Sequence, residues 1–382
     1  MKALIVGCGN IGSVAAEDLA NSMSSIEVVI ADKDEKRAKT VADGIGKSNV
    51  SHRTIDVTNR KTLVHTLSDF DVILGFLPGK LGYQLIEACI EAERDLVDVS
   101  FMAENPLELS NNAVKAAVTI VPDCGLAPGI SNLLVGQAAA SLDEVCDVHI
   151  MVGGLPEKDV PPLGYVITWS PDSLIDEYTR KARIVRKGKI VDVEVLSGLE
   201  TIGFPGFGKL EAFFTDGLRT LMYTIRSTGD MWEKTLRYSG HAEKIKLLKM
   251  LGFFEDTQVQ VDGTAVSPRK LTAKLLGKKL TNPEMHDIVA LKVEVSGIAN
   301  GKKTRRVYHL LDECDRKRGI TAMARTTAYP ASIVAQLMLK KLVKEKGVVP
   351  PEKLGMDAKI AKAFLSDLAK RGVHVNCRKM SD

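Results

Sequence analysis

The chain lacks the features that mark several large classes of protein. Its 382 residues include six cysteines and two tryptophans, and aromatic residues make up 5% of the total. The cysteines are scattered without a Cys-x-x-Cys pair, so we expect reduced thiols rather than a zinc cage or a small disulfide framework. The seven histidines form no His-Glu-x-x-His motif, which leaves open only a metal site assembled from distant residues.

Charge of one sign and long apolar runs are also missing. Lys and Arg number 52 against 48 Asp and Glu, a net charge of +4, so the sequence does not supply the positive field that nucleic acids require. No stretch approaches the roughly 18 to 20 apolar residues that span a bilayer. The short apolar run at 3–6 ends at Gly7, too early for the core of a signal peptide. We therefore expect a cytoplasmic protein that binds neither nucleic acid nor membrane.

What the chain does have is ample material for a buried core. Hydrophobic residues make up 45% and charged residues 26% of the sequence. At about 100 to 200 residues per domain, this length predicts two or three domains.

The first third of the chain alternates short β-rich runs with longer helical runs. Such alternation predicts βαβ units and a doubly wound parallel sheet of the Rossmann type, and the nearly continuous apolar strands indicate helices on both faces. The expected strands are 3–6, 26–31, 50–55, 71–76, 96–99 and 118–121, and the expected helices include 12–21, 34–42 and 80–92.

After about residue 125 the pattern changes to longer strands with hairpin signals. The stretch 182–195 contains a Lys-Gly-Lys turn and 287–312 contains an Asn-Gly turn. Helices are expected at 130–141, 217–226, 241–251 and 329–345, with an amphipathic tail at 357–371. These patterns predict an α/β protein with a second, α+β domain whose sheet is mainly antiparallel. The predicted domains are 1–125, 126–325 and 326–382.

A Gly-x-Gly-x-x-Gly motif directly follows the first strand and opens a helix, the context expected of a dinucleotide site. Gly7 permits the tight turn, Gly9 lets the backbone approach a pyrophosphate, and Gly12 lets the helix pack on the strand. The free N–H groups of the helix start attract phosphate. Asn10 and Ile11 complete the expected cofactor contact.

An acidic residue at the end of the second strand predicts which dinucleotide binds. Asp32 is placed to accept hydrogen bonds from the ribose hydroxyls and to repel a 2′-phosphate, so NAD is favoured over NADP. Lys33, Lys36 and Arg37 follow directly and soften that preference.

Further polar residues lie at the carboxyl ends of expected strands, where open α/β sheets bind their ligands. Asp56 and Val57 are expected near the adenine, with an ordinary strand-end aspartate as the alternative for Asp56. Asp98, Ser100 and Asp123 are expected near the nicotinamide, with helix capping as the alternative. The full set of expected cofactor contacts is Gly7, Gly9, Asn10, Ile11, Gly12, Asp32, Asp56, Val57, Leu77 and Ser100.

Several segments resemble the saccharopine dehydrogenase-like family. They are GCGNIG at 7–12, DCGLAPGISN at 123–132, EAFFTDGLRTL at 211–221, TLRYSGHAEK at 235–244 and GVVPPEKLG at 347–355. The resemblance implies a Rossmann domain joined to an α/β domain that binds substrate and forms a homodimer interface, with late helices that return to the Rossmann domain. Within the family it implies the branch that uses NAD to oxidise the 6-amino group of lysine, releasing ammonia and a semialdehyde.

Matching charges to a lysine zwitterion then suggests roles. Arg219 and Arg237 suit its carboxylate, with structural ion pairs as the alternative. Carboxylates suit its amines, with helix capping as the alternative for Asp216. His241 titrates near neutrality and is a candidate proton relay, the alternative being a helix-start histidine. The expected catalytic residues are Asp98, Asp123 and His241, and the expected substrate contacts are Asn132, Glu211, Thr215, Asp216, Arg219 and Arg237.

Two other functions fit the same patterns. One is an imine reductase of the same family, such as a saccharopine or carboxynorspermidine dehydrogenase, which additional cationic pocket residues would favour. The other is a catalytically silent NAD-binding regulator, because a fold alone does not establish an activity. The mixed polar loops argue against the regulator, since an interface is richer in aromatic and aliphatic residues.

Overall fold

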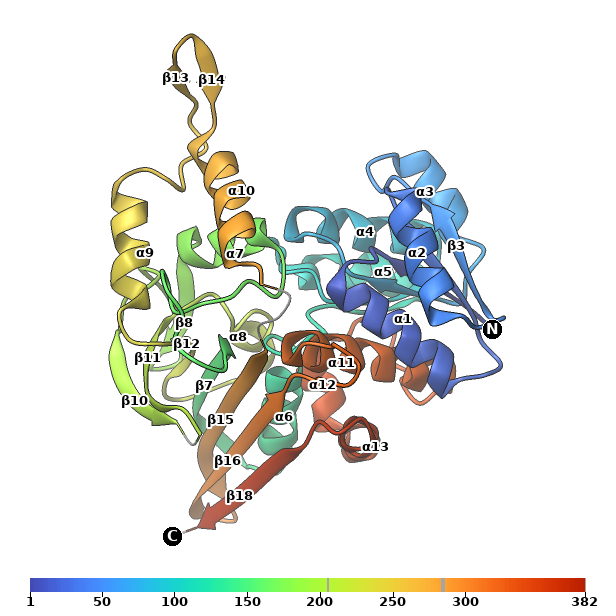
Figure 1. Cartoon of the computed structure of the whole chain (residues 1–382). Helices are drawn as coiled ribbons and strands as arrows, with labels where there is room; N and C mark the ends of the chain where they lie inside the picture. The colour runs from blue at the N-terminus through green and yellow to red at the C-terminus, as the bar shows by residue number, and fades with distance from the viewer. Residues whose placement is uncertain (205, 283–285, 382) are drawn as a thin grey trace. The chain divides into compact units, whose positions relative to one another are not determined.

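The protein consists of two compact units, each assembled from segments that are distant in the sequence (Figure 1). The structure, a computed structural model, describes residues 1–204, 206–282 and 286–381. Unit 1 comprises Met1–Leu142, Arg219–Ile225 and Ala324–Val375. Unit 2 comprises Asp143–Leu218, Arg226–Met323 and Asn376–Asp382.

Unit 1 is built on a seven-stranded parallel sheet. Its strands, in spatial order, are β17 (Gly347–Val348), β6 (Thr119–Val121), β5 (Asp95–Asp98), β4 (Val72–Gly75), β1 (Lys2–Val6), β2 (Glu27–Asp32) and β3 (Val50–Thr54). Its helices are α1 (Asn10–Ser22), α2 (Glu35–Ile45), α3 (Arg60–Leu67), α4 (Gly79–Glu91), the 3-10 helix η1 (Pro106–Leu109), α5 (Ser110–Lys115), α6 (Ile130–Ala139), α8 (Leu221–Thr224), α12 (Pro351–Met356) and α13 (Ala358–Lys370).

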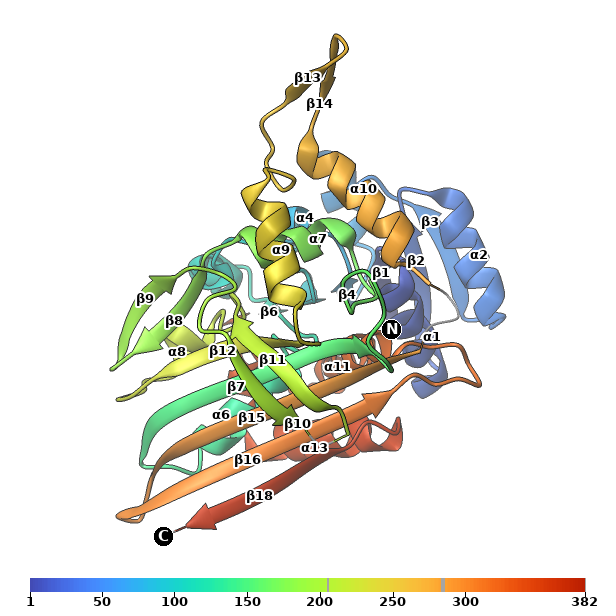
Figure 2. The same cartoon turned by 60° about the vertical axis from the view of Figure 1, so that its left-hand side comes forward.

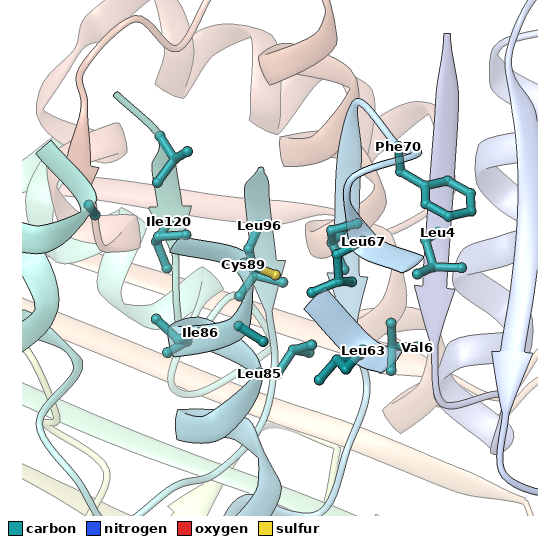
Figure 3. Packing of buried hydrophobic residues seen from close by; sticks show 14 of the residues in the cluster. Leu4, Val6, Leu63, Leu67, Phe70, Leu85, Ile86, Cys89, Leu96 and Ile120 are labelled. Atoms are coloured by element: carbon teal, nitrogen blue, oxygen red, sulfur yellow. The ribbon is translucent and has the colours of Figure 1, made fainter. Parts of the chain in front are cut away.

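Apolar side chains cover both faces of this sheet. On one face Leu4 and Val6 of β1 pack with Leu63 of α3 and Leu85 of α4 in a single buried cluster (Figure 3). The alternate residues of β1 point to the other face, and Ile5 among them is also fully buried. This confirms the predicted doubly wound sheet; its inner strands are near-continuously apolar, whereas the edge strand β3 is largely exposed.

The helix α6 belongs to unit 1, whereas its residues were expected in the second domain. A Cβ atom at Gly136 of α6 would lie 1.9 Å from the Glu352 carbonyl oxygen, and one at Gly355 of α12 would lie 2.0 Å from the Leu133 carbonyl oxygen. The two glycines therefore let α6 and α12 approach backbone to backbone. This close packing ties residues after 125 to the late segment of unit 1.

Over the described residues, unit 2 is built on a nine-stranded sheet. Figure 2 shows its long central strands. The strands are β10 (Glu200–Phe204), β11 (Gly208–Phe214), β12 (Met231–Arg237), β7 (Glu144–Pro156), β15 (Asp287–Ala299), β16 (Lys302–Glu313) and β18 (Val375–Ser381), with β8 (Ala182–Arg186) and β9 (Lys189–Val193) off this path. β12 pairs parallel with β7, and the pairs β10–β11, β11–β12, β8–β12, β8–β9, β7–β15 and β15–β16 are antiparallel. The remaining elements are α7 (Pro171–Thr179), α9 (His241–Met250), α10 (Pro268–Leu280) and the hairpin β13 (Val259–Val261) with β14 (Thr264–Val266).

Both predicted hairpins are confirmed. β8 and β9 pair across the turn at Lys187 and Gly188, and β15 and β16 pair across Asn300 and Gly301. All four turn residues have positive φ, as type I′ two-residue loops require at both central positions.

The prediction of a helix at 217–226 is wrong, because only the single helical turn α8 (Leu221–Thr224) forms there. Arg219 has φ 53°, in the left-handed region, and this interrupts any helix that starts before it. Asp216 is not its N-cap, since its carboxylate is hydrogen-bonded to Arg183.

The helix expected at 329–345 is displaced, because α11 spans Ala322–Leu339. Its start is capped by Asp287 of β15, whose carboxylate accepts hydrogen bonds from the N–H groups of Ala322 and Met323 at 2.7 and 2.9 Å. The helix ends at Leu339, two residues before Lys341, whose φ of 57° lies in the left-handed region and cannot continue a right-handed helix. Along residues 1–204, 206–282 and 286–381, no helix has the combined length and hydrophobicity needed to cross a membrane.

Candidate functional site

The glycine-rich turn of unit 1 has the geometry of a phosphate-binding loop. Gly7 has φ 93°, and a Cβ there would lie 2.5 Å from the Phe76 carbonyl oxygen; at Gly12 it would lie 2.0 Å from the Gly7 carbonyl oxygen. At Gly9, by contrast, no heavy atom of the described residues lies within 4 Å of an added Cβ. The first and third glycines are thus required by the fold, and the second leaves open space at the start of α1.

The N-terminus of α1 is available to an anion. No side chain in the described part of the chain caps this end, and its first turn carries no acidic residue. Asn10 is exposed there and Ile11 is half-buried. Free N–H groups at the start of a 13-residue helix attract phosphate, so these residues fit a dinucleotide.

Asp32, at the end of β2, is hydrogen-bonded to the glycine-rich turn. Its carboxylate accepts hydrogen bonds from the Cys8 N–H at 3.1 Å and the Asp34 N–H at 3.0 Å. Arg37 lies 3.9 Å away. Burial opposes ionisation, but these hydrogen bonds prevail and lower the pKa of Asp32. Burial and the adjoining Asp32 carboxylate raise the pKa of the Cys8 thiol to about 12, so the thiol is a hydrogen-bond donor here.

The other expected cofactor residues follow the neighbouring strands. Asp56, after β3, is exposed and accepts two hydrogen bonds from Thr58, while Val57 is half-buried. Leu77, after β4, lies beside Gly7, since a Cβ on that glycine would be 3.5 Å from its Cδ2. Ser100 is buried after β5. All of these residues lie at the carboxyl end of the sheet.

Asp98 is a fully buried carboxyl at the end of β5. It accepts hydrogen bonds from the Ser100 N–H at 2.8 Å and the Ser100 hydroxyl at 3.0 Å. Burial raises its pKa to about 7, and the negative charge of Asp123 adds to the effect. Asp98 is therefore poised to exchange a proton near neutral pH.

Asp123 forms a buried ion pair with Arg219. The guanidinium Nε lies 3.2 Å from a carboxylate oxygen, and the Arg219 side chain also lies over the Phe101 ring at 5.7 Å. Both partners have positive φ, 54° and 53°, a costly backbone conformation for residues with side chains. This is the structural ion pair expected from the sequence as the alternative for Arg219, and the binding of a substrate carboxylate by Arg219 stays a prediction.

Asn132 takes part in a second buried network of unit 1. Its amide oxygen accepts hydrogen bonds from the Gly129 N–H and the Ser131 hydroxyl, and its amide nitrogen donates to Glu352 at 3.3 Å. Glu352 also accepts a hydrogen bond from Thr224 at 2.6 Å. Burial raises the pKa of Glu352. These hydrogen bonds give Asn132 a structural role at the start of α6; its contact with a substrate stays a prediction.

In unit 2, Arg237 is buried among partners of its own. Its Nη2 lies 3.2 Å from both carboxylate oxygens of Glu177, its Nε donates to the Tyr178 hydroxyl, and its guanidinium lies 4.5 Å from the centre of the Tyr165 ring. The expected role in binding a substrate carboxylate therefore competes with an internal ion pair.

His241 does not titrate near neutrality, contrary to the expectation from sequence. Its Nδ1 lies 2.8 Å from the Leu163 carbonyl oxygen, which can only accept, so Nδ1 carries the proton. Its Nε2 then accepts from the Tyr178 hydroxyl at 2.8 Å. Burial, together with the nearby Arg237 charge, lowers the pKa of His241 to about 3. The ring is a neutral link in the Arg237 network.

The remaining expected substrate residues of unit 2 also have internal partners. Glu211 accepts hydrogen bonds from the N–H groups of Gly240 and Ala242 and so caps α9. Asp216 forms ion pairs with Arg183 and Arg180. Thr215 is hydrogen-bonded to Thr235 at 2.9 Å, and Thr235 donates to Glu177.

Two groupings therefore emerge within the units. Asp98, Asp123 and Arg219 lie with the cofactor turn in unit 1, and Thr215, Arg237 and His241 share a network in unit 2. Glu177 and Tyr178, which link Arg237 to Thr235 and His241, were not identified from the sequence. A Glu-Tyr pair within a helix matches no known sequence motif, so no signal pointed to them. Within the described residues, no group of three or more His, Cys, Asp or Glu side chains is arranged to hold a metal ion.

The chain matches two family models in succession. Residues 3–121 match the saccharopine dehydrogenase NADP binding domain, and residues 125–373 match the saccharopine dehydrogenase C-terminal domain. The first boundary agrees with the end of β6 and the second model includes most of unit 2.

Curated relatives are distant. Saccharopine dehydrogenase [NADP(+), L-glutamate-forming] of Saccharomyces cerevisiae is 26% identical over 75% of this chain and 66% of its own length. Alpha-aminoadipic semialdehyde synthase of Arabidopsis thaliana is 24% identical over 91% of this chain, which spans 42% of that protein. Carboxyaminopropylagmatine dehydrogenase of Synechocystis is 22% identical over 94% of both chains.

A solved structure confirms the predicted fold class. Apo saccharopine dehydrogenase (L-Glu forming) from Saccharomyces cerevisiae superimposes with a TM-score of 0.80, covering 99% of both chains at 20% identity. At this identity the likeness concerns the fold.

Proposed function

The chain belongs to the saccharopine dehydrogenase family, and on that premise we propose that it is an oxidoreductase that uses a nicotinamide dinucleotide to act on a carbon–nitrogen bond of an amino-acid-derived amine. The more specific proposal is lysine 6-dehydrogenase activity. In that reaction lysine, NAD⁺ and water give 2-aminoadipate 6-semialdehyde, ammonium, NADH and a proton. The semialdehyde then cyclises to piperideine-6-carboxylate with loss of water.

The geometry of the glycine-rich turn is the observation that carries the proposal. Gly7 and Gly12 are held close to backbone, Gly9 borders open space, and Asp32 is hydrogen-bonded to the turn itself. A bound dinucleotide supplies a hydride acceptor; the chain's own residues bind its phosphates at the start of α1 and its ribose at Asp32.

Asp98 and Asp123 support a role in proton transfer. An amine must lose its proton before its carbon can give up a hydride, because the nitrogen lone pair drives that step. Asp98, with a pKa of about 7, suits a proton acceptor at neutral pH. Asp123, paired with Arg219, contributes to the raised pKa of Asp98 through its negative charge. These placements support the catalytic roles proposed for both carboxylates.

The electrostatics around Asp32 bear on the choice between NAD and NADP. Its carboxylate is ionised and directed at the turn, which supports NAD because a 2′-phosphate would be repelled. Arg37, with a side chain 55% exposed, offers that phosphate a partial partner. We therefore propose NAD as the preferred cofactor, with NADP accepted more weakly.

The internal pairing of two arginines supports lysine over a substrate rich in carboxylates. Arg219 is paired with Asp123 and Arg237 with Glu177, so neither adds a net positive charge for a substrate. Lysine brings one carboxylate, and saccharopine brings three. The competing function is the oxidation of a secondary amine such as saccharopine, or the reverse reduction of an imine. Its support comes from the relatives, which are a saccharopine dehydrogenase and a carboxyaminopropylagmatine dehydrogenase.

These functions are separated by measuring the absorbance of the reduced cofactor in three reactions. One contains lysine, one contains saccharopine and one contains no amine. Each substrate is tested with NAD and with NADP at alkaline pH. NADH formed with lysine alone supports the lysine proposal, and dependence on saccharopine supports the alternative. Dinucleotide binding without turnover on either amine would contradict both and leave the NAD-binding regulator.

Two variants of one strand connect the activity to Asp98. Asp98→Asn removes the titrating carboxyl and should lower kcat by about 10²-fold or more, the scale of lost general-base catalysis. Asp95→Asn, at the opposite end of β5, is the matched control because Asp95 accepts hydrogen bonds from the Thr119 N–H and the Lys346 ammonium group, away from the turn. Equal activity in the two variants would exclude Asp98 as the proton acceptor.

A further inference from the structure

Cys8, the residue between the first two glycines of the turn, is buried although the turn borders open space. Cys8 is 2% exposed, whereas a Cβ added to Gly9 would have no heavy atom of the described residues within 4 Å. The Cys8 thiol donates a hydrogen bond to the Asp32 carboxylate oxygen Oδ2, with the sulfur 3.4 Å from that oxygen. The Cys8 side chain is therefore directed at the end of β2 and not into the space beside Gly9.

Successive hydrogen bonds join the glycine-rich turn to the end of β2. The Gly7 N–H donates to the Ala31 carbonyl oxygen at 2.8 Å, and the Cys8 N–H donates to Asp32 Oδ2 at 3.1 Å. The Cys8 thiol donates to the same oxygen. Because one residue supplies both donors to Oδ2, a rotation of the Asp32 carboxylate would break both hydrogen bonds.

The two oxygens of the Asp32 carboxylate are used differently. A carboxylate oxygen accepts about two hydrogen bonds, and Oδ2 receives both of its bonds from Cys8. Over the described residues, Oδ1 accepts from the Asp34 N–H at 3.0 Å, so it keeps an acceptor position. A ribose hydroxyl needs such a position at the end of the second strand. Cys8 thereby determines which oxygen Asp32 offers to a dinucleotide.

The Cys8 thiol stays a donor at any pH suited to the protein. Burial and the adjoining Asp32 carboxylate raise the pKa of the thiol to about 12. A deprotonated sulfur would repel the carboxylate, whereas the protonated thiol is attracted to it. The contact between Cys8 and Asp32 therefore persists in alkaline solution as well as at neutral pH.

Arg37 is the alternative partner of the Asp32 carboxylate. Its guanidinium Nη1 lies 3.9 Å from Oδ2, longer than a hydrogen bond, and its side chain is 55% exposed. A carboxylate released from the thiol is able to turn and form a hydrogen-bonded ion pair with this guanidinium. Such a pair would offset the negative charge that discriminates against a 2′-phosphate.

We propose that Cys8 is a positioning residue for cofactor choice, whose thiol holds the Asp32 carboxylate in the orientation that accepts a ribose hydroxyl and keeps it from pairing with Arg37. Cys8 thereby increases the preference for NAD over NADP. This inference rests on the proposed dinucleotide-dependent function. Because Cys8 acts on the cofactor through Asp32, its effect on binding should disappear when Asp32 is removed.

Infrared spectroscopy tests the thiol contact without any cofactor. The S–H stretching band of Cys8 is isolated as the difference between the spectra of the unaltered protein and of Cys8→Ala. It should lie at lower frequency than the band of a free thiol, and it should move to higher frequency when the same difference is taken in an Asp32→Ala background. Cys89 is the control, since it is buried in the apolar cluster of the sheet and its band should not respond to Asp32→Ala. A Cys8 band that does not respond would overturn the proposal.

Fluorescence titration with NAD and with NADP measures the effect on cofactor choice, expressed as the ratio of the two dissociation constants. Cys8→Ala should lower the preference for NAD about three- to tenfold, the scale of one hydrogen bond. Cys8→Ser restores a donor and should recover most of that preference. Cys89→Ala, the matched loss of a buried thiol, should leave the ratio unchanged. In an Asp32→Ala background, Cys8→Ala should have no further effect on the ratio.

The outcomes separate this inference from the proposed function. An unchanged ratio in Cys8→Ala, a failure of Cys8→Ser to recover it, or an equal loss in the Asp32→Ala background would overturn the role of Cys8 and leave the dinucleotide site in place. Absence of binding of either cofactor by the unaltered protein would contradict the proposed function itself, and this inference with it.

Discussion

Buried charge distinguishes this chain at the scale of single residues. Asp98, Asp123, Arg219 and Arg237 are each at most 3% exposed. A buried ionised group is costly unless it is paired, and three of these four are paired within the chain. Asp98 is instead hydrogen-bonded to Ser100, and its raised pKa reflects that difference.

The raised pKa of Asp98 predicts how stability depends on pH. Because the folded pKa of about 7 exceeds the unfolded value of 3.8, the protonated carboxyl stabilises the fold below about pH 4, and this contribution is lost as pH rises through 7. The Asp98→Asn variant removes the titration. Denaturant unfolding should therefore show it gaining on the order of 4 kcal/mol relative to the unaltered protein between pH 4 and 8. A constant difference across that range would contradict the assigned pKa.

The Arg237 ion pair predicts a different pattern of stability. Arg237→Ala leaves the Glu177 carboxylate, 11% exposed, without its cationic partner and with the Thr235 hydroxyl as a remaining donor, so it should cost about 3 kcal/mol. Adding Glu177→Gln to Arg237→Met removes both charges and should restore most of that loss in chemical unfolding. If the double variant were as unstable as Arg237→Ala, packing rather than charge would explain the effect. A rise in the half-saturating lysine concentration for the stable double variant would show that Arg237 also binds substrate.

Asp32 carries the prediction on cofactor choice. Asp32→Ala removes the ribose acceptor and the repulsion of a 2′-phosphate, so it should weaken NAD binding more than NADP binding. Arg37→Ala should do the reverse, because it removes the cation beside the phosphate position. Dissociation constants from fluorescence titration give both ratios, and equal losses for the two cofactors in Asp32→Ala would remove Asp32 from cofactor selection.

The sequence predicted residue positions better than residue partners. The glycine turn and Asp32 lie where the motif places them, since their geometry depends on a few consecutive residues. Glu211 and Asp216 were expected to contact a substrate, whereas they cap α9 and pair with Arg183. Those partners lie 29 to 33 residues away, and no local pattern indicates them.

At the scale of elements, close backbone approach explains which segments pack together. Gly136→Ala should destabilise unit 1 by several kcal/mol, since the new methyl group would overlap the Glu352 carbonyl and separate α6 from α12. Gly44→Ala in α2 is the control, because no described heavy atom lies within 4 Å of its Cβ position and alanine favours helix by about 1 kcal/mol. Thermal melting should shift down for the first variant and slightly up for the second; equal shifts would contradict the packing of α6 on α12.

Strands were predicted more accurately than helix ends. The inner strands of unit 1 follow from apolar runs that the parallel sheet buries on both faces, whereas the edge strand β3 is polar and largely exposed. The start of α11 depends on Asp287, a residue 35 positions away from Ala322, and its end on a lysine with positive φ. The capping aspartate is distant in the sequence, and a positive φ is unusual for lysine. The sequence therefore indicated neither end of α11, and the predicted helix was displaced.

At the scale of the whole molecule, the chain crosses between its two units more than once. Arg219–Ile225 and Ala324–Val375 belong to unit 1, although unit 2 supplies the segments on either side of Arg219–Ile225. A ligand that binds unit 1 should stabilise it by mass action, by about 2.7 kcal/mol at a hundredfold excess over its dissociation constant.

Calorimetric titration of NAD into the unaltered protein and into Gly9→Asp most directly tests the account. We expect one NAD to bind per chain of the unaltered protein. We expect Gly9→Asp to lose that binding, because its carboxylate would occupy the open space beside Gly9 and repel phosphate. Gly44→Ala should bind NAD normally. Absence of NAD binding by the unaltered protein, or unchanged binding by Gly9→Asp, would contradict a dinucleotide site at the glycine-rich turn.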